Sequence, residues 1–175
     1  LATTMGGAAG LMPQEASAAA PKKGGHIRLG LSQGNTTDSM DMAIMSSEFP
    51  ATCRQNTQNQ LVEVSHDGSL TPELAESWGA DGTDVGTWIV NLRKDVTFHD
   101  GKTLDANDVI GTIHYHNSEN SKSNLKTVAK TIETMTADTK HRLIIRLKEP
   151  NAHFPFLMST FHINSIKDDK PYDFM

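Results

Sequence analysis

The sequence has almost no cysteine: Cys53 is the only one among its 175 residues. A single thiol excludes an internal disulfide, and it excludes every metal site that is built from several cysteines. No neighbouring pattern suggests that the thiol is activated. We therefore interpret Cys53 as an unreactive, buried thiol of the kind that an exported protein tolerates, and a reactive thiol is the alternative.

The chain also lacks an excess of positive charge. Its 16 lysines and arginines are outnumbered by 21 acidic residues, so the formal net charge is −5, and the basic residues are scattered. A surface that binds nucleic acid needs concentrated basic residues, because contacts to phosphates supply much of its affinity. The composition therefore argues against nucleic acid as a partner.

Signatures of catalysis and of phosphate binding are missing as well. The sequence contains no G-x-S-x-G motif and no framed cysteine–histidine pair that would mark a nucleophile. Gly24 and Gly25 precede an apolar segment and do not join a strand to a helix, so they form no phosphate loop. The adjacent carboxylates Asp168 and Asp169 are typical of a solvated surface. We expect a protein that is not an enzyme, and a secreted enzyme is the remotest alternative.

No apolar run is long enough to cross a membrane. Residues 1–12 are weakly apolar, but a membrane-spanning helix needs about 20 apolar residues. An A-x-A sequence follows at residues 16–18, which is the pattern that signal peptidase cuts. We interpret residues 1–18 as the remnant of a signal peptide whose glycine content suits the twin-arginine route. A disordered Ala/Gly-rich tail is the alternative.

The densest structural signals lie near the middle of the chain. Thr71 as N-cap and Pro72 in the first turn predict a short helix with Leu74 and Trp78 on one face. Residues 88–92 alternate in character and predict a half-buried strand. The residues on the buried face of that strand are Trp88, Val90 and Leu92.

A turn and a second helix follow this strand. Asp100 and Gly101 predict a tight turn, because glycine tolerates a positive φ. Asp105 is a good N-cap, and Asp108 stands three residues later, much as in a capping box. The apolar residues that this helix is expected to bury are Val109, Ile110 and Ile113.

The rest of the chain predicts a mixed α/β (α+β) domain. A hydrophobic content of 37% is enough for one moderate core. Polar stretches at residues 32–47 and 118–123 predict loops. The remaining elements are strands at 26–31, 62–64, 131–136 and 141–147, and helices at 51–61 and 125–129.

Several motifs in a fixed order resemble a known family. They are L-x-P-x-L-A-E-S-W at residues 70–78, W-x-x-x-L-R-x-x-V-x-F-H-D-G-K-x-L at 88–104 and A-x-D-V at 106–109. Weaker matches are the GGHIRLGL strand, the Ser-Met-Asp at 39–41, LIIRL and FPFL. Together they cover residues 24–166 and are similar to the family 5 extracytoplasmic solute-binding proteins, the peptide, nickel and opine receptors of ABC importers.

The resemblance implies a fold and a division of the chain. Members of the family have the type II periplasmic-binding-protein fold, in which two lobes close on the ligand. By this likeness the chain is an N-terminal fragment that holds part of one lobe. After the signal remnant we expect the first strand and loop of lobe I at 19–42, its inserted subdomain at 43–166 and a truncated linker at 167–175.

The resemblance also points to a ligand-binding loop at residues 36–49. This loop is rich in hydroxyls, carboxylates and methionines, and methionine side chains adapt to ligands of varied shape. By position in the family, Met45, Ser46, Ser47 and Glu48 line the cleft between the lobes, and an ordinary surface loop is the alternative. At the cleft rim the candidates are Phe161, which can stack on a ligand, and His162, which can donate a hydrogen bond. A core phenylalanine and a surface histidine are the alternatives there.

The implied function is the non-covalent capture of peptides or similar small solutes in the periplasm, without a cofactor. The implied partners are the ligand and an ABC permease in the inner membrane, and the receptor is expected to be a monomer. Eight histidines keep open a nickel, metallophore or haem receptor on the same scaffold. His114 and His116 are two apart on a predicted helix, so they point in different directions and cannot chelate from one face.

Overall fold

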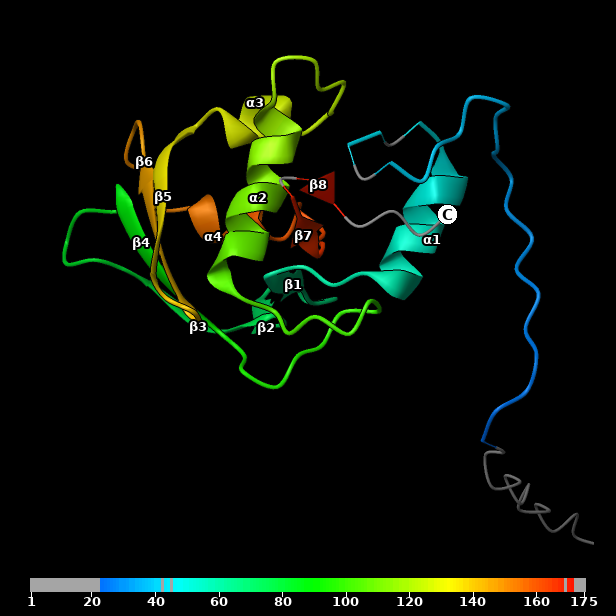
Figure 1. Ribbon diagram of the computed structural model, residues 1–175, viewed down its shortest axis with the longest axis horizontal. Coiled ribbons are helices and arrows are strands. Elements are labelled where there is room, and N and C mark those ends of the chain that lie inside the picture. Colours follow the sequence, from blue (N-terminus) through cyan, green and yellow to red (C-terminus); the bar gives the residue numbers. More distant parts are fainter. Residues whose placement is uncertain (1–22, 42, 45, 169, 172–175) are drawn as a thin grey trace, which may run out of the picture. The chain divides into compact units, whose positions relative to one another are not determined.

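The structure is a computed structural model that describes residues 23–41, 43–44, 46–168 and 170–171 (Figure 1). The chain divides into two units, Leu1–Gly30 and Leu31–Met175. The predicted remnant of a signal peptide lies outside the described residues. No helix in the described part of the chain has the length and apolar character that crossing a membrane requires.

The described part of the first unit, residues 23–30, contains no helix and no strand. The prediction of a strand at 26–31 is therefore wrong for this chain. Ile27 and Leu29 carry the alternation that suggested it, yet they are 79% and 62% exposed. A strand depends on hydrogen bonds to a neighbouring strand, and the described residues supply none for this segment.

A four-stranded antiparallel sheet is the largest sheet of the second unit. Its strands are β3 (Ala75–Ala80), β4 (Thr87–Leu92), β5 (Ile132–Thr139) and β6 (Arg142–Leu147), in the order β3-β4-β6-β5. The predicted alternation in β4 is confirmed, because every second residue from Trp88 is buried. The same alternation in β6 buries Leu143, Ile145 and Leu147 on the core side.

The predicted helix starting at Thr71 is wrong. This segment forms β2 (Leu70–Pro72), which pairs with β1 (Val62–Val64), and then β3. Trp78 lies opposite Val90 in the sheet, so tertiary pairing overrides the local helix signals. Gly79, which weakens a helix, stands directly after Trp78.

The longest helix is α2 (Ala106–Asn117), and its predicted start is confirmed. The Asp105 side chain accepts from the Asn107 N–H at 2.8 Å, and the Asp108 side chain accepts from the Asp105 N–H at 3.0 Å. Gly101 has φ +85° in the predicted turn. The helix packs against β5, α3 (Lys126–Ala129) and the short pair β7 (Ile166–Lys167) and β8 (Lys170–Pro171) (Figure 1).

Two further helices complete the unit. The helix predicted at 51–61 is α1 (Glu48–Thr57). It begins earlier than predicted because Ser47 caps it. It ends at Thr57, because the next residue, Gln58, has an extended backbone. The last helix, α4 (Phe154–Met158), places Phe154 against Trp88 with ring centroids 6.2 Å apart. The described residues of the segments 32–47 and 118–123 form loops, as predicted.

Candidate ligand-binding site

The predicted ligand loop is organised around Asp38. Its carboxylate accepts from the Ser46 hydroxyl at 2.8 Å, from the Ser47 hydroxyl at 2.9 Å and from the Asn35 N–H at 2.8 Å. These bonds stabilise the charged form, so the pKa of Asp38 lies below its usual value, with the Asn35 backbone contributing most. The loop therefore has internal hydrogen bonds of its own.

Three of the predicted loop residues have structural roles in this arrangement. The Ser47 hydroxyl also accepts from the Phe49 N–H at 3.3 Å and so caps α1. Glu48 is exposed and accepts from the Ser32 hydroxyl at 2.9 Å. Ser46 is exposed and bonded to Asp38 as described. Met45 lies outside the described residues.

The two predicted rim residues lie in different environments. Phe161 is only 2% exposed and packs edge-on against His116, with ring centroids 5.3 Å apart. Its ring belongs to the core in this structure. His162 is half-buried, and its Nε2 lies 3.4 Å from the Gln60 amide nitrogen. His162 lines a cavity.

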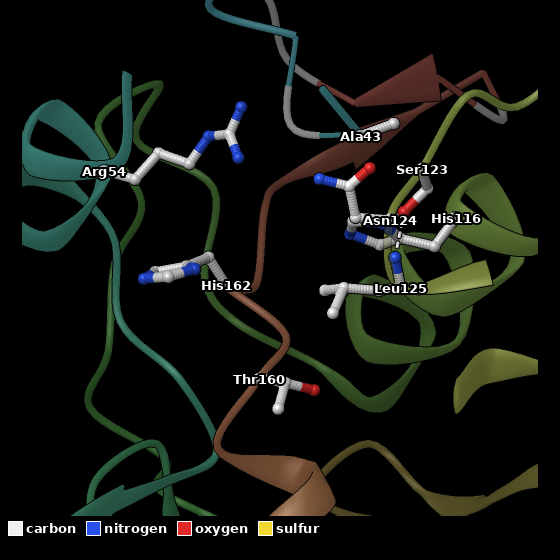
Figure 2. Close-up of a pocket in the computed structure, with 8 residues that line it drawn as sticks. All are labelled: Ala43, Arg54, His116, Ser123, Asn124, Leu125, Thr160 and His162. Carbon is white, nitrogen blue, oxygen red and sulfur yellow. Dashed lines mark hydrogen bonds between the residues drawn. The ribbon is translucent and has the colours of Figure 1, made fainter. Parts of the chain in front are cut away.

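That cavity gathers side chains from distant parts of the second unit (Figure 2). Arg54 extends from α1 on one side, and His116 from α2 lies on the other with Ser123. Asn124 and His162 also line it. The space is about 10 Å³, which is close to what one water molecule or one oxygen atom needs.

Arg54 is the main charged group of the cavity. It is 3% exposed, and its Nη2 donates to the backbone carbonyls of Asp41 and Ile44, both at 2.5 Å. Its Nε is buried and has no hydrogen-bond partner among the described residues. Burial lowers the pKa of Arg54, and the negative charge of Asp41 partly opposes this effect.

The two histidines of the cavity are held in their neutral form. Burial, and then the charge of Arg54, lower the pKa of His116 to about 4. The same two causes lower the pKa of His162. The His116 Nδ1 lies 2.6 Å from the Ser123 hydroxyl, so this ring is held in place. At neutral pH the cavity therefore carries the positive charge of Arg54.

A wider groove adjoins the cavity, and both are lined by Ala43. Its volume is about 340 Å³, which is within the range of small-molecule sites. Tyr115 donates its hydroxyl to the Asp41 carboxylate at 3.1 Å on one wall. The lining also includes Ser118, Asn120, Ser121 and Lys122. The groove offers a solute several hydrogen-bonding side chains and a concave surface, and both suit non-covalent binding.

Sequence reasoning did not select Arg54 or His116 as a residue that lines the cavity. His116 follows Val109 and Ile113 at helical spacing, so the apolar face of α2 points to it as an inward polar residue. Arg54 lies four residues after Pro50 on α1, and both are buried. A polar residue on the buried face of a helix was the available signal in both cases.

The helical placement of His114 and His116 is confirmed: His114 is exposed and His116 is buried. The described residues contain no group of three or more histidine, cysteine, aspartate or glutamate side chains that could hold a metal ion.

Comparison with known proteins identifies the family. The model for bacterial extracellular solute-binding proteins, family 5 (middle part), matches residues 69–175, which is more than half of the chain. The nickel-binding periplasmic protein of Escherichia coli (strain K12) is 34% identical over 97 residues, covering 55% of this chain and 18% of that protein.

Solved structures agree in fold. A nickel ABC transporter from Bacillus halodurans matches with a TM-score of 0.54 and 33% identity, over 63% of this chain and 22% of that one. The oligopeptide-binding protein AppA from Bacillus subtilis, in complex with a nonapeptide, matches with a TM-score of 0.64 and 18% identity, over 71% of this chain and 25% of that one. The chain spans less than a third of each relative. It belongs to the bacterial extracellular solute-binding proteins of family 5, and its α/β fold is that of part of one lobe of a type II periplasmic binding protein.

Proposed function

We propose that this chain supplies one wall of the ligand cleft in the solute-binding component of an ABC importer. The observation that carries the proposal is the groove of about 340 Å³ between the loop at Asp41–Ile44 and the end of α2. Its lining joins apolar surface to several polar groups, and its volume suits part of a peptide or a similar small solute. Capture is non-covalent, which agrees with relatives that are named as binding proteins.

The proposed mechanism is closure of two lobes on the solute by a hinge motion, after which the closed form docks on a membrane permease. In this scheme residues 19–42 are the first strand and loop of lobe I, residues 43–166 are its inserted subdomain, and residues 167–175 belong to a linker. We further propose export to the periplasm through an N-terminal signal of the twin-arginine kind, and action as a monomer. No nucleic acid and no cofactor take part.

Nickel, as the ion or as a complex with a small molecule, is a second candidate ligand. Two relatives that are more than 30% identical carry nickel in their names. The described residues hold no ready set of metal ligands, so a complex that presents organic groups to the groove fits this wall better than the bare ion. The same groove would be used in both cases.

The proposal is tested by NMR titration of the 175-residue chain with a mixture of tripeptides and, separately, with nickel bound to a small organic chelator. One wall of a cleft binds weakly, so we expect a dissociation constant above about 1 mM and amide shifts at residues 41–44 and 118–122. The absence of shifts in the groove with both kinds of probe would contradict the proposal.

A matched pair of variants tests whether the amide shifts come from binding in the groove. Lys122 lies on the groove, whereas Lys130 is exposed elsewhere. Lys122→Glu should change peptide binding several-fold, and Lys130→Glu should leave it unchanged. Equal effects of the two substitutions would show that the shifts report only the net charge of the protein.

A further inference from the structure

One wall of the groove is a turn in the loop before α1. Asp41, Ala43 and Ile44 line the groove and belong to this turn. The Ile44 N–H donates to the Asp41 carbonyl at 3.0 Å, and the Ala43 N–H donates to the Asp41 carboxylate at 2.8 Å. A loop opens at little cost in free energy unless other groups hold it. The shape of this wall therefore depends on what binds the turn from outside.

Arg54 binds the turn from the side of α1. Its Nη2 donates to the carbonyls of Asp41 and Ile44, both at 2.5 Å, so one nitrogen joins the two ends of the turn. The side chain is 3% exposed, and Figure 2 shows it running from α1 towards the segment that carries Ala43. Hydrogen bonds from a charged donor are roughly twice as strong as neutral ones. Arg54 therefore fixes the backbone of the turn against α1.

Tyr115 binds the same turn from α2. Its hydroxyl donates to the second carboxylate oxygen of Asp41 at 3.1 Å. The turn is thus bonded to α1 through its backbone and to α2 through a side chain, and both connections include Asp41. Because Tyr115 also lines the groove, the two connections set how far this wall lies from α2.

Arg54 acts on the groove without facing it. Among the described residues, the lining of the groove includes Tyr115 but not Arg54, which lines the small cavity instead. A solute in the groove therefore meets the turn and not the guanidinium. Removal of Arg54 should change solute binding only through the position of the turn.

We propose that Arg54 and Tyr115 are positioning residues of the groove, which hold the turn at Ala43 between α1 and α2 before a solute arrives. The inference rests on the proposed function, because the groove is its solute site. Ordering a loop costs conformational entropy. A wall that is already ordered spares the solute this cost, and its affinity rises accordingly.

The test is NMR hydrogen exchange in the full chain. In Arg54→Ala the amides of Ala43 and Ile44 should lose protection by about tenfold or more, because a charge-assisted anchor is gone. The shifts caused by tripeptides at the groove should weaken in the same variant. Arg142→Ala, at an exposed arginine, is the control and should change neither. Unchanged protection of both amides in Arg54→Ala would overturn the proposal.

Addition of guanidinium ion separates positioning from a general role in the fold. The ion can occupy the space that Arg54→Ala leaves and donate to the same carbonyls. At a concentration well below that which unfolds the chain, it should restore both the protection and the tripeptide shifts, whereas sodium chloride at equal ionic strength should not. If β4 exchanges faster together with the turn, or if guanidinium restores nothing, Arg54 is a general structural residue and the proposal is wrong.

A second variant decides the question if Arg54→Ala does not fold. Tyr115→Phe removes the hydroxyl and keeps the ring. The amides of Ala43 and Ile44 should then exchange several-fold faster, because the turn loses its bond to α2, and the tripeptide shifts should weaken. Unchanged exchange and unchanged shifts in this variant would contradict the proposal.

Failure of this inference is distinguishable from failure of the proposed function, because hydrogen exchange needs no solute. Equal binding of tripeptides by the unaltered chain and by Arg54→Ala would overturn the inference and leave solute capture in place. Loss of protection in Arg54→Ala, in a chain whose unaltered groove responds to no tripeptide and no nickel chelate, would support the anchoring of the turn and overturn the proposed function.

Discussion

Lys102 and Asp108 form an ion pair at the start of α2, although the Asp108 side chain is fully buried and that of Lys102 is 36% exposed. The Asp108 carboxylate also accepts from the Asp105 N–H at 3.0 Å and from the Ile166 N–H at 2.9 Å. The Lys102 ammonium in turn donates to the Ile166 carbonyl at 3.1 Å. One buried carboxylate therefore joins the turn after Phe98, the capping box of α2 and strand β7.

Removal of the lysine should destabilise the fold. In Lys102→Met, Asp108 stays buried with its backbone donors but loses its counter-charge, so we expect a loss of about 2–3 kcal/mol in the free energy of unfolding. Urea unfolding measures this loss. Arg146→Met is the control, because its ion pair with Glu133 is exposed on both sides and should be worth less than about 1 kcal/mol. If the two variants lose equal amounts of unfolding free energy, the buried ion pair of Asp108 contributes no more than an exposed one, and the prediction is wrong.

Stability should fall as the pH is lowered from neutral towards 4. The pKa of His116 is about 4 in the folded chain and 6.5 in its unfolded reference, so between these values the unfolded state binds one proton more. The unfolding free energy should then drop by about 1.4 kcal/mol per pH unit, and by about 3 kcal/mol in total. The lowered pKa of His162 acts in the same direction.

Urea unfolding at several pH values above 4.5 checks this dependence, because the acidic groups with lowered pKa values titrate below that range. His116→Gln should reduce the change of the unfolding free energy with pH. His114→Gln should keep it, because His114 is exposed on the opposite side of the helix. If the His116 variant keeps the same dependence of unfolding free energy on pH, another group causes the effect.

Gly111 should be intolerant of a methyl group. A Cβ at this position would lie 2.8 and 2.9 Å from the Cγ1 and Cγ2 atoms of Ile166, which is too close for carbon atoms. Gly111→Ala should therefore cost about 1–3 kcal/mol by overpacking, although alanine is ordinarily the better helix residue. Gly79→Ala, where a Cβ meets nothing within 4 Å, should be neutral or stabilising. Thermal unfolding of both variants, and recovery in Gly111→Ala combined with Ile166→Ala, checks this contact.

Ser47 should matter for stability more than for binding. Its hydroxyl caps α1 and bonds to Asp38, so Ser47→Ala should lose about 1 kcal/mol of stability. Binding of tripeptides at the groove should remain, measured on the same sample. A variant with unchanged stability and weaker binding of peptides would instead assign Ser47 to direct contact with the ligand.

Local signals predicted the elements whose causes are local. The capping box at Asp105, the turn at Gly101 and the alternation in β4 all depend on residues a few positions apart, and all are confirmed. The helix predicted at Thr71 failed because β3 takes its hydrogen bonds from β4. The predicted strand at 26–31 failed for the opposite reason, since it has no partner among the described residues.

The candidate site was predicted only in outline. The loop at residues 36–49 does border the groove through Asp41 and Ala43. Ser47, which was predicted to line the cleft, caps a helix, and Phe161 lies in the core. Spacing along the chain could place these residues near one another, but it could not decide which side chains point towards the cavity.

The sequence by itself therefore determined the family and the short-range structure, because ordered motifs, caps and turns are encoded by neighbouring residues. Only the tertiary structure decided that Arg54, His116 and His162 share one cavity, and that Arg54 is buried there. These residues come from α1, α2 and the segment after α4. Their meeting depends on packing between distant segments, and so do the burial and charge that set their chemistry.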